Sequence, residues 1–584
     1  VQKNWAAIDA GAKQVVEVKV PESWKDAEDE GLFMAHATHG AQEAQDFVNN
    51  IQCKINAQEG NTLPVSAFTE YVDGTTPSGT AAYEKRGIAV NVPVWQPENC
   101  IQCNRCAYVC PHAAIRPVAL TEEEAANAPE GMATLPMTGM KDYKFTMTVS
   151  AYDCTGCGSC ANVCPGKKGA KALAMENMEA NAGLQKFFDY GRELPIKEDV
   201  IAKFKETTVK GSQFKQPLLE FSGACAGCGE TPYAKLITQL FGDRMYIANA
   251  TGCSSIWGNS SPSTPYTTNA KGQGPAWANS LFEDNAEFGY GMLLAQRAIR
   301  DGLKAKVEDV VANGTNEDVK AAGQEWLDTF AVGATNGAAT DKLVAALEAC
   351  GCDKAKEILA QKDFLAKKSQ WIFGGDGWAY DIGFGGVDHV LASGRDINVM
   401  VFDTEVYSNT GGQSSKSTPT GAIAQFAAGG KETKKKDMAS IAMSYGYVYV
   451  AQISMGADFN QTVKAIAEAE AYPGPSLIIA YAPCINHGIK KGMAKAQTEE
   501  ELAVKVGYWH NFRFNPAAEG NKFSLDSKAP SMEDYQAFLD GEVRYNSLKR
   551  QNPEKAARLF AKNEAEAKAR FEYLQKLIAL HSAE

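Results

Sequence analysis

The sequence has no long apolar run, too few cysteines for a disulfide scaffold and no excess of positive charge, and each absence excludes a class of protein. No stretch of about 20 uninterrupted apolar residues occurs, so we expect no bilayer-spanning helix and no membrane partner. Acidic side chains outnumber basic ones by 70 to 58, a net charge of −12. This balance argues against nucleic acid as a partner, because phosphate selects a basic face. Fifteen cysteines in 584 residues are too sparse for a disulfide scaffold.

The first residues also lack the basic segment and apolar run that mark an export signal. The initiator methionine is missing, and we expect Val1 to lie inside a longer gene product. Most of the cysteines fall in short C-x-x-C groups, which in a reducing compartment indicate metal or redox chemistry, so we expect a cytoplasmic protein. With 45% hydrophobic and 22% charged residues, the composition is that of an ordinary globular protein long enough for about four domains.

The composition along the chain predicts four segments. Residues 1–40 suggest a short helix, a strand at 15–20 and an acidic turn, which is too little to close a core, so we interpret them as the C-terminal end of a preceding domain. Residues 41–81 mix one amphipathic helix with turn residues and predict a connector. Residues 82–198 form a small cysteine-rich unit, and residues 199–584 form the largest domain.

The largest domain alternates apolar strand candidates with helical stretches, which predicts an α/β fold with a parallel sheet covered by helices on both faces. The strand candidates are 245–250, 371–374, 397–403, 447–453 and 476–481. Residues 305–368 are helical and charge-rich, and we expect them to be an insertion on this sheet. Residues 553–580 space their leucines and aromatics on one helix face, which predicts a docking helix.

Two cysteine runs carry the strongest signal in the sequence, because each fits C-x2-C-x2-C-x3-C-P. In that spacing three thiolates bind three corners of one 4Fe-4S cluster, and the fourth cysteine reaches the other cluster. The predicted ligand sets are Cys100, Cys103, Cys106 and Cys164 for one cluster, and Cys154, Cys157, Cys160 and Cys110 for the second. The unit resembles a small α+β two-cluster ferredoxin with an insertion at 116–150. Two structural zinc sites are the alternative, although zinc does not require the duplicated run with its trailing proline.

A third set of cysteines lies in the largest domain. Cys225 and Cys228 sit among glycines, which let the backbone approach a bulky inorganic group. Cys253 and Cys484 each follow a predicted strand, and the carboxyl ends of parallel strands converge on one crevice. The spacing therefore allows a third cluster. For the remaining cysteines, Cys53, Cys350 and Cys352, we expect ordinary thiols.

A diphosphate site is indicated by two further strand ends. Gly374-Gly375-Asp376-Gly377 follows one strand, and Asp403-Thr404-Glu405-Val406 follows the next. Carboxylate, hydroxyl and carbonyl oxygens suit Mg²⁺ with a diphosphate in its shell. Together they form the thiamine diphosphate pattern, with Asp403-Thr404 where an asparagine pair is expected. The alternative is a pair of glycine-rich loops in a nucleotide-type fold, but neither a GxGxxG fingerprint with its acidic residue nor a Walker loop is present.

These residues resemble a known family. Residues 375–386 and 403–413, with Thr251-Gly-Cys-Ser-Ser and residues 275–287, are similar to pyruvate:ferredoxin (flavodoxin) oxidoreductase. The resemblance covers nearly the whole chain, but only the C-terminal half of that enzyme. It implies oxidative decarboxylation of pyruvate with coenzyme A to acetyl-CoA and CO2. Electrons would pass one at a time through three 4Fe-4S clusters to ferredoxin or flavodoxin.

The resemblance also assigns residues. Cys225, Cys228, Cys253 and Cys484 would hold the cluster proximal to thiamine diphosphate. Asp376, Thr404 and the carbonyl of Val406 would bind Mg²⁺, and Gly375 and Gly377 would flank the cofactor. Asn409 would be a catalytic residue near the substrate and the reactive thiazolium, with Cys253 also beside the cofactor.

Partners follow from the same resemblance. The activating glutamate and most of the pyruvate pocket belong to the N-terminal half in this family, so we expect the chain to act only with that half, in a homodimer. Lys167 and Lys168, beside Cys164, could offer an acidic acceptor a landing site, and the alternative is an ordinary solvated surface pair. The other basic run, Lys431 and Lys434 to Lys436, is interpreted as a solvated loop.

Two other functions remain open on the sequence. An enzyme for another 2-oxoacid, such as 2-oxoglutarate, would share these motifs because the half that recognises the side chain is absent. A pure iron-sulfur electron carrier accounts for the cysteine runs but leaves the strand ends at 374–412 without a purpose.

Overall fold

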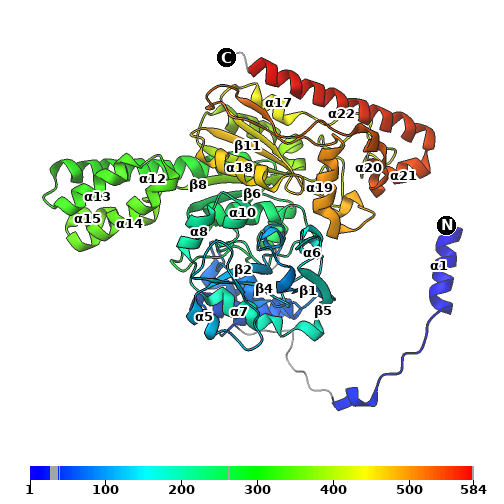
Figure 1. Cartoon of the computed structure of the whole chain (residues 1–584), viewed down its shortest axis with the longest axis horizontal. Coiled ribbons are helices and arrows are strands. Elements are labelled where there is room, and N and C mark those ends of the chain that lie inside the picture. The colour runs from blue at the N-terminus through cyan, green and yellow to red at the C-terminus, as the bar shows by residue number, and fades with distance from the viewer. Residues whose placement is uncertain (27–36, 39, 261–262, 582–584) are drawn as a thin grey trace.

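The computed structural model describes residues 1–26, 37–38, 40–260 and 263–581, and its main feature is one large mixed sheet (Figure 1). Within the described residues this sheet has eight strands in the order β13-β12-β10-β11-β9-β8-β6-β7. The strands from β10 to β7 run parallel, and β12 and β13 add antiparallel at one edge. Its strands are β6 (Met245–Ala250), β7 (Ala276–Ser280), β8 (Ser369–Gly375), β9 (Ile397–Asp403), β10 (Tyr449–Ile453), β11 (Pro475–Tyr481), β12 (Phe512–Phe514) and β13 (Phe523–Leu525). The parallel α/β fold predicted from the sequence is confirmed.

Helices surround this sheet and a smaller unit below it (Figure 1). Those of the N-terminal third are α1 (Gln2–Lys13), α2 (Gln42–Phe47), α3 (Cys53–Asn56), α4 (Arg105–Tyr108), α5 (Glu122–Ala126), α6 (Ser159–Val163), α7 (Leu184–Glu193), α8 (Glu198–Phe204) and α9 (Val209–Ser212). The middle of the chain has α10 (Thr231–Phe241), α11 (Cys253–Ser255), α12 (Asn285–Asn313), α13 (Glu317–Asp328), α14 (Gly333–Cys350), α15 (Asp353–Leu359) and α16 (Phe384–Ala392). The remainder has α17 (Met438–Met443), α18 (Phe459–Ala471), α19 (Ala496–Lys505), α20 (Tyr535–Asp540), α21 (Val543–Gln551) and α22 (Pro553–His581). None of the described helices is both long and apolar enough to cross a membrane.

The two faces of the sheet are buried in separate cores, because successive side chains of a strand point to opposite sides. On β8 and β9, Ile372 and Val399 point into a core that includes residues of α12, α16, α17 and α22. Their neighbours Trp371 and Met400 point into the other core, with residues of α10 and α18. Burial on both faces explains why these strands read as continuous apolar runs rather than as alternating patterns.

The direction of the chain across the sheet reverses between β6 and β8. From β6 the chain moves outward to β7 at the edge, and β8 then pairs with the other side of β6. Ligands of open parallel sheets bind outside the carboxyl ends of the strands at such a reversal. Cys253 follows β6 and Asp376 follows β8, so two of the predicted site residues lie at this point.

The cysteine-rich unit lies on the side of the sheet that α10 covers (Figure 1). Within this unit, strands β1 (Asn91–Trp95) and β5 (Leu173–Asn177) pair antiparallel. The predicted insertion forms a second antiparallel sheet, in the order β2-β4-β3, from β2 (Ile115–Leu120), β3 (Leu135–Pro136) and β4 (Lys144–Val149). Tyr108 of α4 joins the core beneath α10, so the unit and the large sheet share buried contacts.

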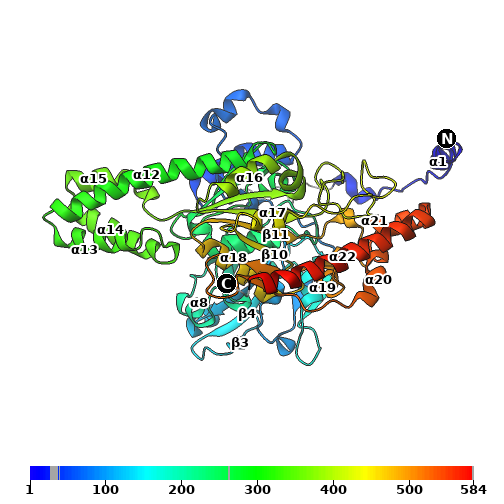
Figure 2. The same cartoon turned by 90° about the horizontal axis from the view of Figure 1, so that it is seen from above.

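The predicted helical insertion is an arm that projects from the sheet (Figures 1 and 2). Its base is α12, which begins at Asn285 against β6 and β8 and continues outward for 29 residues. Helices α13 to α15 pack on the outer part of α12 around a core of their own that contains Trp326. The predicted C-terminal helix is α22, which buries Leu559, Phe560 and Leu574 against the domain.

The N-terminal segment differs from the sequence prediction. Residues 2–13 form α1 as expected, but residues 15–20 form no strand, and the side chains of Val15 and Val18 are 79% and 78% exposed. β-Branched residues favour a strand only where a neighbouring strand is present to pair with. In both views α1 lies apart from the rest of the described structure (Figures 1 and 2). The remainder of the acidic turn, from residue 27, lies outside the described residues.

Candidate functional site

The two cysteine runs fold into loops of the same shape. In the first, Gln102 and Asn104 adopt left-handed φ angles of 56° and 60°; at the equivalent positions in the second, Gly156 and Gly158 have 68° and 79°. The first cysteine of each loop accepts a backbone N–H bond from the residue two positions later, at 3.4 Å to Cys100 Sγ and 3.3 Å to Cys154 Sγ. The duplicated spacing therefore corresponds to a duplicated backbone geometry.

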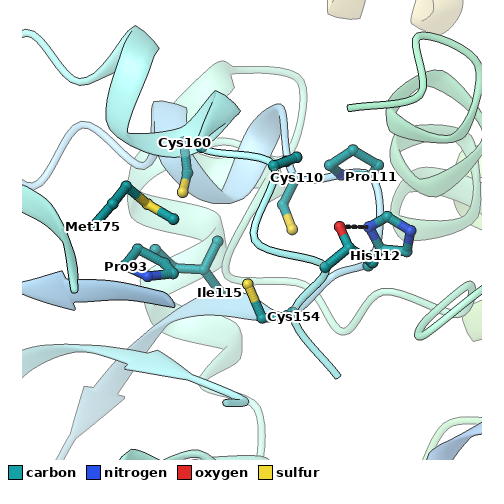
Figure 3. Close-up of a pocket in the computed structure, with 12 residues that line it drawn as sticks. Pro93, Cys110, Pro111, His112, Ile115, Cys154, Cys160 and Met175 are labelled. Atoms are coloured by element: carbon teal, nitrogen blue, oxygen red, sulfur yellow. Dashed lines mark hydrogen bonds between the residues drawn. The ribbon is translucent and has the colours of Figure 1, made fainter. Parts of the chain in front are cut away.

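Each predicted quartet of cysteines lines its own cavity. One cavity is lined by Cys110, Cys154, Cys157 and Cys160, and another by Cys100, Cys103, Cys106 and Cys164. Figure 3 shows the sulfurs of Cys110, Cys154 and Cys160 directed into the first cavity, beside Pro93, Ile115 and Met175. The fourth cysteine of each run thus crosses to the other loop, as the ferredoxin-like pairing predicts.

The cavities suit a group that binds thiolates. Burial raises the pKa of the Cys154 thiol to about 12, and it raises the pKa values of Cys106 and Cys160 well above the ordinary value. Thiols with such pKa values would be protonated at neutral pH unless a cation bound them. In the described part of the chain no three or more His, Cys, Asp or Glu side chains are arranged to hold a single ion. The cysteines surround apolar cavities instead, and a compact, sulfur-ligated inorganic cluster fits this donor set.

The third set of cysteines comes together between α10, β6 and β11. Burial is the largest cause of the raised pKa values of Cys228 and Cys253, but the thiol of Cys484 raises both, and the thiol of Cys228 also raises the pKa of Cys253. Cys225 contributes in the same way to Cys484, whose pKa is raised to about 11. The buried carboxyl of Glu230 faces the same group, and it accepts a hydrogen bond of 2.8 Å from the Trp257 indole.

The cavity lined by Cys154 and Cys157 is adjacent to this third set. The backbone N–H of Gly227, between Cys225 and Cys228, donates to Cys157 Sγ. His112, which also lines this cavity, has its Nε2 2.9 Å from the carbonyl oxygen of Ala224. Cys106, from the cavity lined by Cys100, is close enough to Cys160 to raise its pKa, so that cavity lies beside the cavity of Cys154. The hydrogen bonds of Ala224 and Gly227 connect the third set to the Cys154 cavity, so among the described residues the three groups follow one another in space.

Three oxygens gather at the ends of β8 and β9. Asp376 Oδ1 accepts hydrogen bonds from the backbone N–H and the hydroxyl of Thr404, both at 3.1 Å, and the same hydroxyl lies 3.0 Å from the carbonyl oxygen of Val406. Neighbouring oxygens of an octahedral Mg²⁺ with bonds of 2.0–2.1 Å are about 2.9 Å apart. Burial and then Asp403 raise the pKa of Asp376 well above its usual range. A divalent cation would restore the ionised carboxylate, so the residues present fit Mg²⁺.

Asp403, which stands where an asparagine is expected, is turned to other partners. Its carboxylate accepts hydrogen bonds from Ser417 and Tyr380 and forms an ion pair of 2.8 Å with Lys435. Thr404 therefore supplies the ligand-like oxygen, and Asp403 supplies support beneath it.

The basic run predicted as a solvated loop is partly buried instead. Lys435 also pairs with Glu405 at 3.0 Å, and Arg544 pairs with the other oxygen of Glu405 at 2.8 Å. Burial alone would raise the pKa of Glu405, but the charges of Lys435 and Arg544 hold it at about 2. Lys436 donates to the carbonyl of Tyr380 at 3.0 Å, whereas Lys434 is exposed. These supports lie far apart in the sequence, and no local pattern marks them.

Two glycines flank Asp376 for different reasons. A Cβ on Gly377 would come within 2.4 Å of the Tyr407 ring, so a side chain there would displace the loop. A Cβ on Gly375 would meet only the carbonyl oxygen of Phe402, at 3.9 Å, which leaves that side of the strand end open for a ligand. Asn409 is exposed in the following loop, and its predicted role stays a prediction.

One residue connects the oxygen triad with the third set of cysteines. The Ser408 hydroxyl lies 2.7 Å from the Thr404 hydroxyl and also hydrogen-bonds Cys253 Sγ. Asn486 then bridges from the Ser408 carbonyl, at 3.3 Å, to Cys484 Sγ, at 3.6 Å. The sequence analysis did not single out Ser408 or Asn486. The only sequence feature that could have indicated them is their position, since Ser408 shortly follows Thr404 and Asn486 shortly follows Cys484.

Three sequence families match parts of the chain. A 4Fe-4S dicluster domain matches residues 99–168, and the C-terminal TPP binding domain of thiamine pyrophosphate enzymes matches residues 331–480. A domain of unknown function, EKR, matches residues 35–89. The dicluster match covers both cysteine loops, and the other large match covers the strand ends with the oxygen triad.

The chain is also similar to whole proteins. The pyruvate-flavodoxin oxidoreductase of Enterobacter agglomerans is 56% identical over 99% of this chain and 49% of its own length. The pyruvate:ferredoxin oxidoreductase of Moorella thermoacetica is 56% identical over 98% of this chain and 49% of its own length. A solved 2-oxoglutarate:ferredoxin oxidoreductase of Magnetococcus marinus aligns with 15% identity and a TM-score of 0.27, covering 56% of this chain and 90% of that one. The chain spans about half the length of the curated relatives that it matches.

Proposed function

We propose that this chain, which matches pyruvate-flavodoxin and pyruvate:ferredoxin oxidoreductases along nearly all of its residues and spans about half of their length, is the C-terminal half of such an enzyme. It would bind thiamine diphosphate with Mg²⁺ and carry three 4Fe-4S clusters. The observation that carries the proposal is the position of Ser408, which contacts the oxygen triad through Thr404 and the third set of cysteines through Cys253. A carbon-chemistry site and an electron-transfer site are thereby adjacent.

The oxygen triad would hold the diphosphate through Mg²⁺. Asp376, Thr404 and the Val406 carbonyl supply three neighbouring oxygens, and the open side of Gly375 leaves room beside them. When bound, thiamine diphosphate supplies the ylid carbon that attacks a 2-oxo group and stores the electrons left after loss of CO2. The Lys435 ion pair fixes Asp403, the residue before Thr404, so the loop stays in place as charge enters the site. Exposed Asn409 follows the triad, where it would contact the substrate.

The cysteine groups would form the path by which single electrons leave. The set of Cys225, Cys228, Cys253 and Cys484 lies beside the triad, and the cavity of Cys157 contacts it through Gly227. The cavity lined by Cys103 and Cys164 comes last. A polar groove borders these two cysteines and includes Arg105 and Lys210.

The acceptor would be an acidic ferredoxin or flavodoxin. It would approach the last cavity, where Lys167 and Lys168 are exposed a few residues beyond Cys164. Opposite charges at such a surface raise the association rate, and salt weakens the effect. A rate of acceptor reduction that does not change with ionic strength would contradict this part of the proposal.

The substrates would be pyruvate and coenzyme A, and the other half of the enzyme would be required. The family resemblance places the activating glutamate and the carboxylate pocket outside this chain. The relatives are about twice as long, which supports a partner half within one polypeptide. We propose a homodimer of the complete enzyme.

Cofactor analysis tests the proposal against its alternatives. The chain is produced anaerobically, alone and together with the missing half, and its iron, sulfide, zinc, magnesium and thiamine diphosphate are measured. We expect about twelve irons per chain, one thiamine diphosphate, and pyruvate-dependent reduction of ferredoxin only when both halves are present. About eight irons without thiamine diphosphate would favour a pure electron carrier, and zinc in place of iron would refute the relay.

Substrate comparison on the two-half enzyme addresses the remaining alternative. Pyruvate, 2-oxoglutarate and a branched-chain 2-oxoacid are compared by kcat/KM with coenzyme A present. The proposal expects pyruvate to be preferred, in line with the relatives. A preference for either of the other two acids would contradict the assignment of pyruvate as the substrate but leave the proposed cofactors unchanged.

A further inference from the structure

Two cysteines that the sequence predicts to be ordinary thiols lie side by side on the arm. Cys350 is the last residue of α14, Gly351 turns the chain with a left-handed φ of 61°, and Cys352 precedes α15. The turn brings the two Sγ atoms to 2.9 Å, compared with about 2.05 Å for a disulfide bond. Only a small movement therefore separates this pair from a covalent link.

The two thiols are accessible to different degrees. Cys352 is exposed, while Cys350 is partly buried against the arm's own core around Trp326. A reagent in solution can reach Cys352 directly, and Cys350 lies behind it within bonding reach. This arrangement of an exposed cysteine with a neighbouring resolving cysteine is the one found in redox-active thiol pairs.

Hydrogen bonds divide the roles further. A hydrogen bond from Cys350 and another from the backbone N–H of Ala355 lower the pKa of Cys352. The same thiol contact raises the pKa of Cys350. The proton therefore stays on Cys350, and Cys352 has the larger thiolate fraction, which is the form that attacks a disulfide.

We propose that Cys350 and Cys352 form a thiol–disulfide exchange site on the arm, which reacts with low-molecular-weight disulfides such as oxidised glutathione and closes an intramolecular disulfide. The Cys352 thiolate attacks one sulfur of the small disulfide, whose S–S bond breaks and releases one small thiolate. Cys350 then loses its proton to that thiolate or to solvent and attacks Cys352 Sγ, which releases the second small thiol. The two cysteines lose two electrons in total, and the small disulfide gains them. This site is independent of the proposed function.

The other cysteines do not compete for the reagent. Twelve of the fifteen fall in the three cluster sets, and Cys53 is 6% exposed. A disulfide reagent under anaerobic conditions also spares the clusters, which a peroxide would attack. The complete enzyme with its clusters can therefore be used.

The experiment measures both thiols on one peptide. The holoenzyme is incubated anaerobically with oxidised glutathione, free thiols are blocked with N-ethylmaleimide, and the protein is digested with trypsin. Residues 343–354 form a single tryptic peptide that contains both cysteines. We expect it to change from a doubly labelled form to an unlabelled form about 2 Da lighter than the dithiol, and to return after treatment with dithiothreitol. Double labelling that persists, or two attached glutathiones, would overturn the proposal.

Single substitutions separate the two roles. Cys350→Ser should trap a stable mixed disulfide of glutathione on Cys352, because the resolving thiol is gone. Cys352→Ser should react several-fold more slowly at Cys350, because Cys350 is less exposed to the reagent than Cys352 is. Cluster absorbance reports that both variants are folded, and Cys53→Ser is the matched control that should leave the peptide's oxidation unchanged. Equal reaction rates of the two single variants would refute the assignment of Cys352 as the attacking thiol.

Discussion

Ser415 donates a hydrogen bond of 2.6 Å to Oδ2 of Asp376, the carboxylate oxygen that Thr404 does not contact. Thr404 fixes one oxygen and Ser415 fixes the other, so the plane of the carboxylate is set from both sides. Both residues are buried, and the Ser415 backbone N–H is in turn bonded to Thr418 at 2.9 Å. The Asp376 carboxylate is thereby held in one rotamer, with Oδ1 fixed beside the other two oxygens of the triad.

We therefore expect Ser415→Ala to weaken the site while leaving its ligands in place. Partners that orient a metal ligand typically contribute about 10–100-fold to metal affinity, and a loss of this size is expected in the Mg²⁺-dependent binding of thiamine diphosphate. Titration calorimetry at several Mg²⁺ concentrations measures it. Ser393→Ala, which removes a hydroxyl bonded only to the local backbone at the end of α16, serves as the control. Equal affinity in the Ser415 and Ser393 variants would show that the carboxylate needs no such support.

Cys484→Ala tests the third set of cysteines. We expect the iron content to fall from about twelve to about eight per chain, with the two cavities of the smaller unit still occupied. The complete enzyme should then oxidise pyruvate and reduce its acceptor far more slowly than the parent protein, because the electron path begins at this set and no other outlet is available. Cys53→Ala should leave both readouts unchanged. Iron analysis and acceptor reduction in the Cys484 variant that match the parent protein would remove Cys484 from the ligands.

The parts of this site that the sequence predicted are the parts with a local signal. The cysteine spacing fixes a loop geometry, so the pairing of Cys110 with the second loop and of Cys164 with the first could be predicted before the cavities were seen. Asp376 and Thr404 follow apolar strands, and adjacent parallel strands bring their ends together.

The missed parts depend on tertiary contacts. Glu405, Lys435 and Arg544 meet in one buried network although 139 positions separate the first from the last, and charged residues in a loop otherwise read as solvated. Strand β7 was missed because Ala276-Trp-Ala-Asn-Ser280 has little β-branched content, and it forms by pairing with β6. The strand predicted at residues 15–20 does not form, because residues with high strand propensity form a strand only where another strand is present to pair with them.

Lys235 offers a test of the path through the smaller unit. It is 2% exposed, and its ammonium donates to the carbonyl of Ala107 and, at 3.1 Å, to that of Tyr108. Burial lowers its pKa to about 8, so it still carries a charge at pH 7, close to Cys106 and Cys110. A positive charge favours the reduced form of a cluster.

We expect Lys235→Met to make the clusters of the smaller unit harder to reduce, with potentials more negative by on the order of tens of millivolts. Redox titration followed by electron paramagnetic resonance measures the shift. Lys235→Arg keeps the positive charge, so it should shift the reduction potentials of these clusters less than Lys235→Met does. If both substitutions leave the potentials of the parent protein unchanged, the lysine is only a structural donor.

Glu220 gives a prediction for the dependence of stability on pH. Its carboxylate is 1% exposed and pairs with Arg116 of β2 and, at 2.7 Å, with Arg192 of α7, so it ties the segment entering the large domain to the smaller unit. Burial would raise its pKa, but the two guanidinium groups lower it below the ordinary value. A carboxyl with a lowered folded pKa stabilises the protein fully above its unfolded pKa of about 4.3. That contribution is lost as the pH falls through the folded value.

Glu220→Gln should therefore reduce the free energy of unfolding at pH 7 by about 3–5 kcal/mol, because the largely buried Arg116 and the partly exposed Arg192 lose the buried charge that pairs with them. The difference from the parent protein should shrink as the pH falls from about 4.3 toward the lowered folded pKa, because the unfolded parent chain then takes up a proton that the folded carboxylate does not. Urea unfolding under anaerobic conditions at a series of pH values measures both effects. Glu193→Gln, an exposed neighbour of Arg192, should change stability by no more than about 0.5 kcal/mol. A destabilisation by Glu220→Gln that stays constant as the pH is lowered would mean that the ion pair is not the source of the stabilisation.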